Sequence, residues 1–143
     1  MDADPFELQR FVEAQDRVWD DVLAELRTAR KRTHWMWFVF PQLAALGRSS
    51  MARHYGLSGL DDARAYWKHP VLGPRLRTCC EALLHNGATD PHAVFGSPDD
   101  LKLRSCLTLF AAAEPGEPLF PQVLDRYYRG VRDDRTLALV QGR

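Results

Sequence analysis

A single pattern recurs along the chain and constrains its fold: a helix-capping residue, then proline, then apolar residues spaced three and four apart. Asp4-Pro5, Asp90-Pro91 and Ser97-Pro98 each begin such a segment. The side chain of a capping residue accepts a hydrogen bond from a free backbone N–H of the first turn, and proline suits that turn because it has no N–H to satisfy. The pattern therefore predicts one helix after another.

Apolar spacing and glycine stops place the remaining helices. We expect a helical hairpin or one bent helix at 4–32, followed by helices at 50–56, 58–69, 73–87, 90–96, 97–113, 121–129 and 134–140. At 143 residues the chain has the length of one domain, which buries roughly two-thirds of the surface that the unfolded chain exposes. The prediction is a compact all-α domain of about seven or eight helices spanning residues 1–143.

The segment His34–Gln42, with the sequence HWMWFVFPQ, is the exception to the helical pattern. Its large apolar residues favour a strand, yet periodicity does not separate a buried strand from a buried helical turn over so few positions. Pro41 disfavours helical geometry at Phe40 and suits the start of a helix that ends at Gly47. Since no second alternating segment is available to pair with a strand, we expect a short buried helical turn or extended segment between helices.

Charge and cysteine content limit the partners and the compartment. The chain has 19 basic and 19 acidic residues, so it provides no overall field to attract nucleic acid or an anionic membrane. No apolar run reaches the roughly 20 residues of a membrane span, and the N-terminus has no apolar signal segment. Three cysteines, two of them adjacent, make a poor disulfide framework. We therefore expect a cytoplasmic protein that binds neither nucleic acid nor membrane.

Sequence spacing identifies no metal site, cofactor or enzyme class. The five histidines show no pair three or four residues apart, and no two cysteines have the spacing of a zinc motif. Neither the glycine-rich dinucleotide fingerprint nor the Walker phosphate loop is present, and the serines lie in capping or helical contexts rather than in a nucleophile elbow. Any site must therefore be assembled by the fold.

Three segments contribute polar groups that could meet in such a site, and each has a purely structural alternative. In the first, Trp35 and Trp37 place two indole N–H donors beside His34 and Gln42, and a buried tryptophan needs a partner for that N–H. The alternative is that the aromatic residues are hydrophobic core. The positive charges of the basic run at 27–34 either complement the dipole at a helix C-terminus and interact with solvent, or hold an anion above the rings of Trp35 and Trp37.

The second segment, 69–77, has two prolines flanking Gly73 where a helix begins. It either holds an anion near Arg75 or forms a rigid turn that sets the angle between two helices. The third segment, 95–110, places Ser105 and Thr108 on one helix face, with Asp100 or Lys102 at its rim. These two hydroxyls either line a pocket walled by the aromatic run or bond back to the preceding turn of the helix.

The same three segments, in this order, resemble a bacterial family of uncharacterised small helical proteins, domain of unknown function eighteen-ten. The resemblance extends from about Asp4 to Val140 and implies a compact multihelical domain; it implies no activity. Some relatives carry the label calpastatin, but calpastatin-type inhibitors are disordered and rich in lysine and proline. A chain with 45% hydrophobic residues and capped helices has the composition of a folded domain instead.

Our first hypothesis is a pocket protein that binds a small nucleotide- or sugar-phosphate-like ligand. Trp35 and Trp37 form the aromatic wall in this hypothesis, and His34 with Asp100 is the catalytic pair if the protein is a hydrolase. The residues predicted to complete the ligand site are Gln42, Arg75, Lys102, Ser105 and Thr108.

The second hypothesis is a non-catalytic interaction module or homodimer. Its anchors are the aromatic segment and the surface predicted around Tyr127-Tyr128-Arg129. A contiguous exposed apolar patch favours this hypothesis, whereas a concave pocket with converging polar groups favours the first. The sequence itself sets no oligomeric state.

Overall fold

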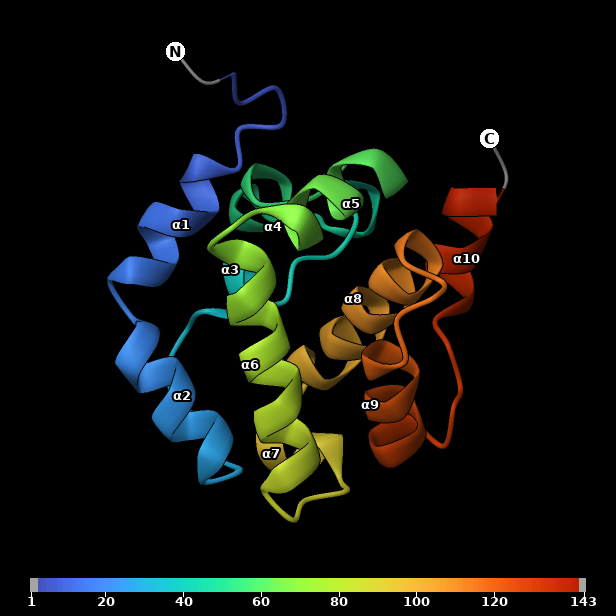
Figure 1. Cartoon of the computed structure of the whole chain (residues 1–143). Coiled ribbons are helices and arrows are strands. Elements are labelled where there is room, and N and C mark those ends of the chain that lie inside the picture. Colours follow the sequence, from blue (N-terminus) through green and yellow to red (C-terminus); the bar gives the residue numbers. More distant parts are fainter. Residues whose placement is uncertain (1–2, 142–143) are drawn as a thin grey trace.

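The computed structural model describes residues 3–141, which form ten α-helices and one short 3-10 helix (Figure 1). In chain order the helices are α1 (Gln9–Asp16), α2 (Trp19–Arg27), α3 (Met36–Val39), the 3-10 helix η1 (Ala44–Leu46), α4 (Ser50–His54), α5 (Leu60–Lys68), α6 (Leu72–His85), α7 (Pro91–Phe95), α8 (Asp99–Ala113), α9 (Leu119–Tyr128) and α10 (Asp134–Gln141). The predicted all-α class is confirmed. Within the described residues, the only β-type pairing is one isolated bridge between Leu43 and Leu57.

The helix count exceeds the predicted seven or eight because the N-terminal segment divides and the aromatic segment forms a helix of its own. The chain leaves helical geometry between α1 and α2, where Val18 has a φ of −132°. Asp20 and Asp21 then lie in the first turn of α2. Carboxylates stabilise the positive end of a helix, so this pair favours a new helix rather than a continuation of α1.

The predicted helix caps are correct at some positions and displaced at others. Asp90 caps α7 as expected, and its carboxylate accepts from the backbone N–H of His92 at 3.0 Å. Asp4 also accepts from the chain that follows, but at Leu8 N (2.8 Å), so α1 begins one turn later than predicted. At α8 the capping position falls on Pro98 rather than Ser97, and proline has no side-chain acceptor to offer.

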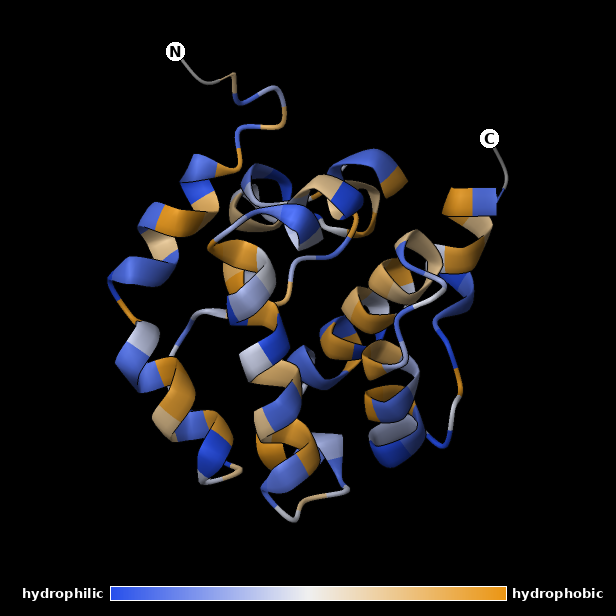
Figure 2. Ribbon diagram, viewed as in Figure 1, coloured by the Kyte–Doolittle hydropathy of each residue, from blue (hydrophilic) through white to orange (hydrophobic). Residues whose placement is uncertain are grey.

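Two long helices form the centre of the molecule. α8 packs against α5, α7, α9 and α10, while α6 packs against α2, α5 and α9. Figure 2 shows apolar and hydrophilic residues interspersed along α6, α8 and α9, and the buried apolar residues of these helices belong to one core. Residues 105–111 of α8 are all buried, as expected for a helix covered on several sides.

Among the described residues, no helix is both long enough and apolar enough to cross a membrane.

The aromatic segment takes the buried helical turn, one of the two forms predicted for it. Its side chains belong to the core at Trp35, Met36, Phe38, Val39 and Phe40. Trp37 alone among the large side chains of this run is half-buried. The helix expected to begin at Pro41 is reduced to the three residues of η1, because the backbone of Leu43 is extended and bridges to Leu57.

Candidate functional site

Trp35 is a core residue whose indole N–H is bonded inside the protein. The side chain is fully buried, and Nε1 donates to Glu25 Oε1 at 3.0 Å. Its ring packs against Phe40 and Phe95, with centroid separations of 6.2 and 6.5 Å. No part of Trp35 is left to form the wall of a site, so its contacts match the core alternative rather than the predicted ligand role.

Glu25 organises the end of the basic run that precedes the aromatic segment. Its carboxylate accepts from the backbone N–H groups of Arg32 (2.7 Å) and Thr33 (3.0 Å) and from the Thr33 hydroxyl (2.6 Å). Burial alone raises the pKa of the Glu25 carboxyl, but the hydrogen bonds from Thr33, Arg32 and Trp35 outweigh burial and hold that pKa below its ordinary value. The charged carboxylate thus fixes the turn between α2 and α3.

A series of charges and rings connects this buried network to the surface. Lys31 Nζ lies 4.9 Å from the centroid of the Trp35 ring and 2.9 Å from Asp99 Oδ2. The other oxygen of Asp99 lies 3.7 Å from Lys102 Nζ. Lys102 in turn lies 5.2 Å from the centroid of the Trp37 ring. Because Asp99 is the first residue of α8, these contacts hold the start of the central helix against the aromatic segment.

Trp37, Gln42 and Lys102 are the predicted site residues that the fold does bring together. They line a small depression whose cavity measures about 10 Å³, and its other lining residues are Met36, Phe40, Ala52, Tyr55 and Gly56. The indole N–H of Trp37 is buried and has no hydrogen-bond partner. Buried donors are nearly always bonded, so an unpaired one calls for a water molecule or a ligand atom. A cavity of this size accommodates about one such atom.

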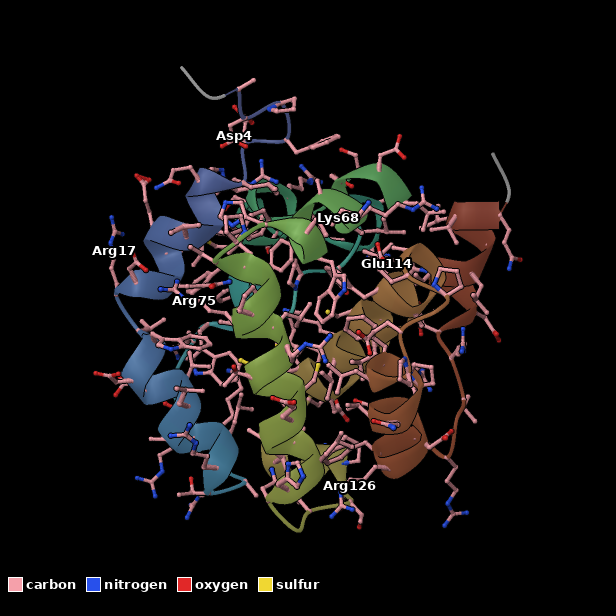
Figure 3. All side chains as sticks on the ribbon, viewed as in Figure 1. Asp4, Arg17, Lys68, Arg75, Glu114 and Arg126 are labelled. Carbon is pink, nitrogen blue, oxygen red and sulfur yellow. The ribbon has the colours of Figure 1, made fainter. Side chains whose placement is uncertain are left out.

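Arg75 lies apart from the depression and braces helices instead. Its Nη2 is 2.7 Å from Asp16 Oδ1, its Nη1 is 3.4 Å from Gln15 Oε1, and the guanidinium lies 5.1 Å from the centroid of the Trp19 ring. Figure 3 shows Arg75 between α6 and the α1–α2 pair. The positive charge predicted to meet a ligand is therefore used to join the N-terminal helices to α6.

Gln15 is a buried, hydrogen-bonded polar residue that the sequence analysis did not single out. Its side-chain amide is buried and donates to the carbonyl oxygen of Phe38 at 2.7 Å and to the Tyr66 hydroxyl at 2.9 Å. Together with Arg75, it links α1, α3, α5 and α6. The sequence signal that could have identified it is its position, as a polar residue, among the apolar residues of the same helix face.

Of the two alternatives for the segment before α6, an anion site or a rigid turn, the contacts match the rigid turn. His69 Nδ1 accepts from Val71 N at 3.1 Å and from Leu72 N at 3.2 Å, so an imidazole occupies the place that the other alternative gives to an anion. A side chain on Gly73 would put a Cβ 2.0 Å from the carbonyl oxygen of Trp67. The glycine therefore permits close contact between α5 and α6, not approach to a ligand.

Ser105 and Thr108 bond back to their own helix. Ser105 Oγ donates to Leu101 O at 3.2 Å, and Thr108 Oγ1 donates to Arg104 O at 2.8 Å. Thr108 Oγ1 also accepts from Asp133 N at 2.9 Å, which fixes the start of α10. Both hydroxyls are thus occupied as in the structural alternative, and neither lines the depression beside Trp37.

The predicted catalytic pair is not joined. His34 is exposed in the bend before α3, whereas Asp100 accepts from its own neighbour Leu101 N at 2.9 Å and lies 3.5 Å from His92 Nδ1. Within residues 3–141 no hydrogen bond or ion pair connects His34 with Asp100. In the same part of the chain, no group of three or more His, Cys, Asp or Glu side chains is arranged to hold a metal ion.

The tyrosines predicted as surface anchors are turned inward. Tyr127 is 5% exposed, and its hydroxyl donates to Leu83 O at 2.7 Å. The Tyr128 hydroxyl donates to the carbonyl oxygen of Asp100. Burial raises the pKa of both phenols. These two residues therefore join α9 to α6 and α8 and leave little aromatic surface for a partner.

A much larger cavity lies elsewhere, at a place that the sequence does not predict. It is a cleft of about 590 Å³ bounded by the N-terminal segment, the 43–45 loop, the start of α5 and the end of α10. Leu139 and Phe6 reach it from opposite ends of the chain, and both are exposed. No local motif marks the cleft, because its walls meet only in the folded molecule.

The fold and the site define a class: an all-helical domain with one partly polar depression beside a half-buried tryptophan and a larger open cleft. The chain belongs to the family described as protein of unknown function (DUF1810), whose model matches residues 5–140. It is similar to the crystal structure of the conserved hypothetical protein Rv1873 from Mycobacterium tuberculosis, with 50% sequence identity and a TM-score of 0.94. The match covers 96% of this chain and 99% of that one. None of the curated proteins compared with the chain matches it.

Proposed function

We propose that this protein binds a small anionic metabolite of the nucleotide or sugar-phosphate kind through Trp37, Gln42 and Lys102. The observation that carries the proposal is the buried indole N–H of Trp37, which has no partner in the described structure. The Lys102 ammonium lies 5.2 Å from the centroid of the same ring, and both residues line the depression. The three residues that line this depression carry an indole N–H, an amide and an ammonium group, which suit an oxygen atom that bears negative charge.

The contacts define how such a ligand is held. Lys102 lies over the Trp37 ring, so a base stacked on that face would displace the ammonium group. The cavity of about 10 Å³ admits about one oxygen atom, and the rest of the ligand lies on the surface above it. The anionic end is therefore the recognised part, and the base or sugar contributes less.

The contacts support ligand binding and do not extend to a catalytic step. The sequence predicts hydrolysis by His34 and Asp100, but Asp100 contacts His92 and its own helix, and His34 lies in the solvent-exposed bend. A general acid and base must reach the same substrate atoms. The catalytic part of the hypothesis thus stays a prediction, to be tested by assaying His34→Ala and Asp100→Asn once a ligand is known.

Thermal unfolding with a panel of ligands tests the proposal. The panel contains inorganic phosphate, AMP, ADP-ribose and glucose 6-phosphate, each paired with its uncharged counterpart where one exists. A ligand at a hundred times its Kd adds about 2.7 kcal/mol to the free energy of unfolding, which raises the Tm of a domain of this size by roughly 9 °C. We expect a shift of that order for at least one phosphate compound and none for its uncharged form.

Matched variants locate the binding. Trp37→Phe removes the N–H but keeps an aromatic ring, and Trp19→Phe is its control because Trp19 is also half-buried but lies under Arg75. Lys102→Met removes the ammonium group, with Lys68→Met as the exposed control. We expect titration calorimetry to show at least tenfold weaker binding for the two site variants and unchanged binding for the controls. A flat panel, or equal affinities in Trp37→Phe and the wild type, overturns the proposal.

A further inference from the structure

The cleft of about 590 Å³ has the size of a small-molecule site and is separate from the depression beside Trp37. Its walls come from the N-terminal segment at Phe6, the loop at Leu43, the first turns of α5 and the last turn of α10. Four segments that are distant in sequence thus enclose one concave surface.

The sides of the cleft are apolar. Phe6 and Leu139 are 37% and 45% exposed, and they are two of the five large hydrophobic side chains that the described structure leaves exposed. Leu43, Ala45, Leu60 and Val140 complete the apolar lining. Two exposed apolar side chains facing one cleft differ from singly scattered ones, which are ordinary on protein surfaces. These sides suit the hydrocarbon part of a ligand.

The polar end of the cleft disfavours an anion. The carboxylate of Asp62 accepts from Ser58 N at 2.5 Å and from Gly59 N at 2.9 Å, so it already occupies the backbone donors at the start of α5. An anionic group entering here would meet a carboxylate instead of free N–H groups.

The charges at that end favour a cation. The lining contains two carboxylates, Asp61 and Asp62, and one guanidinium, Arg64. Arg64 Nη1 lies 3.3 Å from Asp61 Oδ1, and its Nε donates to Ala113 O at 3.1 Å, so the single positive charge is already engaged. The Asp61 side chain is 87% exposed. Two carboxylates and one guanidinium leave a net negative charge at this end of the cleft. Asp62 is buried, so Asp61 is the carboxylate that a ligand can reach.

From these contacts we infer that the cleft binds a small amphipathic cation, with its hydrocarbon part against Phe6 and Leu139 and its ammonium or guanidinium group beside Asp61. The inference is independent of the anion site proposed at Trp37, because no residue lines both places. A single apolar body with one positive end satisfies the apolar sides and the charge excess together.

Three probes with the same eight-carbon chain and different ends test the charge preference: octylammonium, octanoate and octanol. Binding to the full chain is followed by titration calorimetry below the aggregation concentration of each probe. We expect octylammonium to bind at least tenfold more tightly than octanoate, with octanol between them. Equal or tighter binding of octanoate, or no binding of octylammonium, overturns the inference.

Matched variants test the location. Leu139→Ser should weaken octylammonium binding at least fivefold, whereas Leu101→Ser, a change at another exposed leucine, should leave it unchanged. Asp61→Asn should remove the preference for the cation, and Asp20→Asn, which also changes a first-turn aspartate, should not. Unchanged Tm values confirm that these exposed changes leave the fold intact.

Two further measurements distinguish the cleft from the depression at Trp37 and a small ligand from a second copy of the chain. Trp37→Phe should leave octylammonium binding unchanged, so failure at one site is distinguishable from failure at the other. Sedimentation at increasing protein concentration identifies a second copy of the chain as the occupant. A dimer that dissociates in Leu139→Ser overturns the small-molecule inference.

Discussion

Trp35 and Trp37, separated by one residue, have opposite surroundings. Trp35 is fully buried and its N–H is bonded to Glu25, whereas Trp37 is half-buried and its N–H is unpaired. Trp35 precedes α3 and Trp37 lies in its first turn, so the two side chains point in different directions and only Trp37 lines the surface depression. The same residue type thus contributes to stability at one position and to the proposed binding at the other.

This difference predicts unequal losses of stability in two conservative variants. Trp35→Phe leaves a cavity and an unpaired Glu25 acceptor, so we expect the free energy of unfolding to fall by about 3 kcal/mol. Trp37→Phe removes an N–H that has no protein partner, and the expected loss is about 1 kcal/mol or less. Urea unfolding followed by circular dichroism measures both. A larger loss for Trp37→Phe than for Trp35→Phe would contradict the assignment of core and site.

Glu25 gives the molecule a predictable dependence on acid. Its pKa in the folded protein lies below the ordinary value of 4.5. The charged carboxylate therefore stabilises the folded state at pH values above about 4.5, and this contribution is lost as the pH falls through the folded pKa. Glu25→Gln should cost roughly 3 kcal/mol at pH 7, because an amide group then faces four donors.

The pH dependence of that cost is the diagnostic measurement. The stability difference between wild type and Glu25→Gln should shrink between pH 7 and pH 3, since the wild-type carboxyl becomes protonated over that range. Glu13→Gln, at an exposed position of α1, is the control and should change stability by less than about 0.5 kcal/mol. A difference that grows toward pH 3 would show that Glu25 is not held in its charged form.

Among the elements, the corner between α5 and α6 depends on one close contact. Gly73 approaches the carbonyl of Trp67 so closely that a Cβ would lie 2.0 Å from its oxygen. Gly73→Ala must push the two helices apart, and we expect a loss of about 2 to 3 kcal/mol in the free energy of unfolding. Gly116→Ala is the control, because a Cβ there meets nothing within 4 Å. Denaturant titration of both variants should show a loss for Gly73→Ala only.

Arg75 is the brace between α6 and the N-terminal helices. Arg75→Lys keeps the charge but cannot reach Gln15 and Asp16 with two nitrogens. Because this pair is partly exposed, the expected loss of stability is only about 1 kcal/mol. Arg17→Lys, at an exposed position of the same region, should have no measurable effect. Binding of any ligand at Trp37 should be unchanged in Arg75→Lys, and weaker binding would restore the ligand role predicted from the sequence.

The elements show which parts of the structure local sequence rules could predict. Helix positions followed from capping residues and apolar spacing, both of which act within a few residues. The bonds that decide each polar residue's role involve other segments: Thr108 accepts from Asp133, and Arg75 contacts Asp16. Of the residues predicted for the site, only Trp37, Gln42 and Lys102 line the depression. Residue type alone could not separate them from Trp35, whose partner is a glutamate of the preceding helix.

At the scale of the whole molecule, stability is concentrated in the central helices. α6 and α8 contact most of the other long helices and carry all three cysteines. Cys79, Cys80 and Cys106 are free and buried. Burial raises the pKa of each thiol, which disfavours the reactive thiolate while the protein is folded. A reagent can therefore reach these sulfurs only when the core around α6 and α8 opens.

The three thiols should consequently report the global unfolding of the domain. At pH 8 we expect a chromogenic disulfide reagent to label the native protein at least on the order of 10³-fold more slowly than the urea-unfolded chain, as a stability of about 5 kcal/mol or more implies. All three should react in one kinetic phase, because opening α6 or α8 disrupts the shared core. Gly73→Ala should accelerate this phase by the factor that its measured loss of stability predicts, whereas Gly116→Ala should not. A single thiol that reacts rapidly in the native protein would show instead that one of the central helices opens locally while the rest of the domain stays folded.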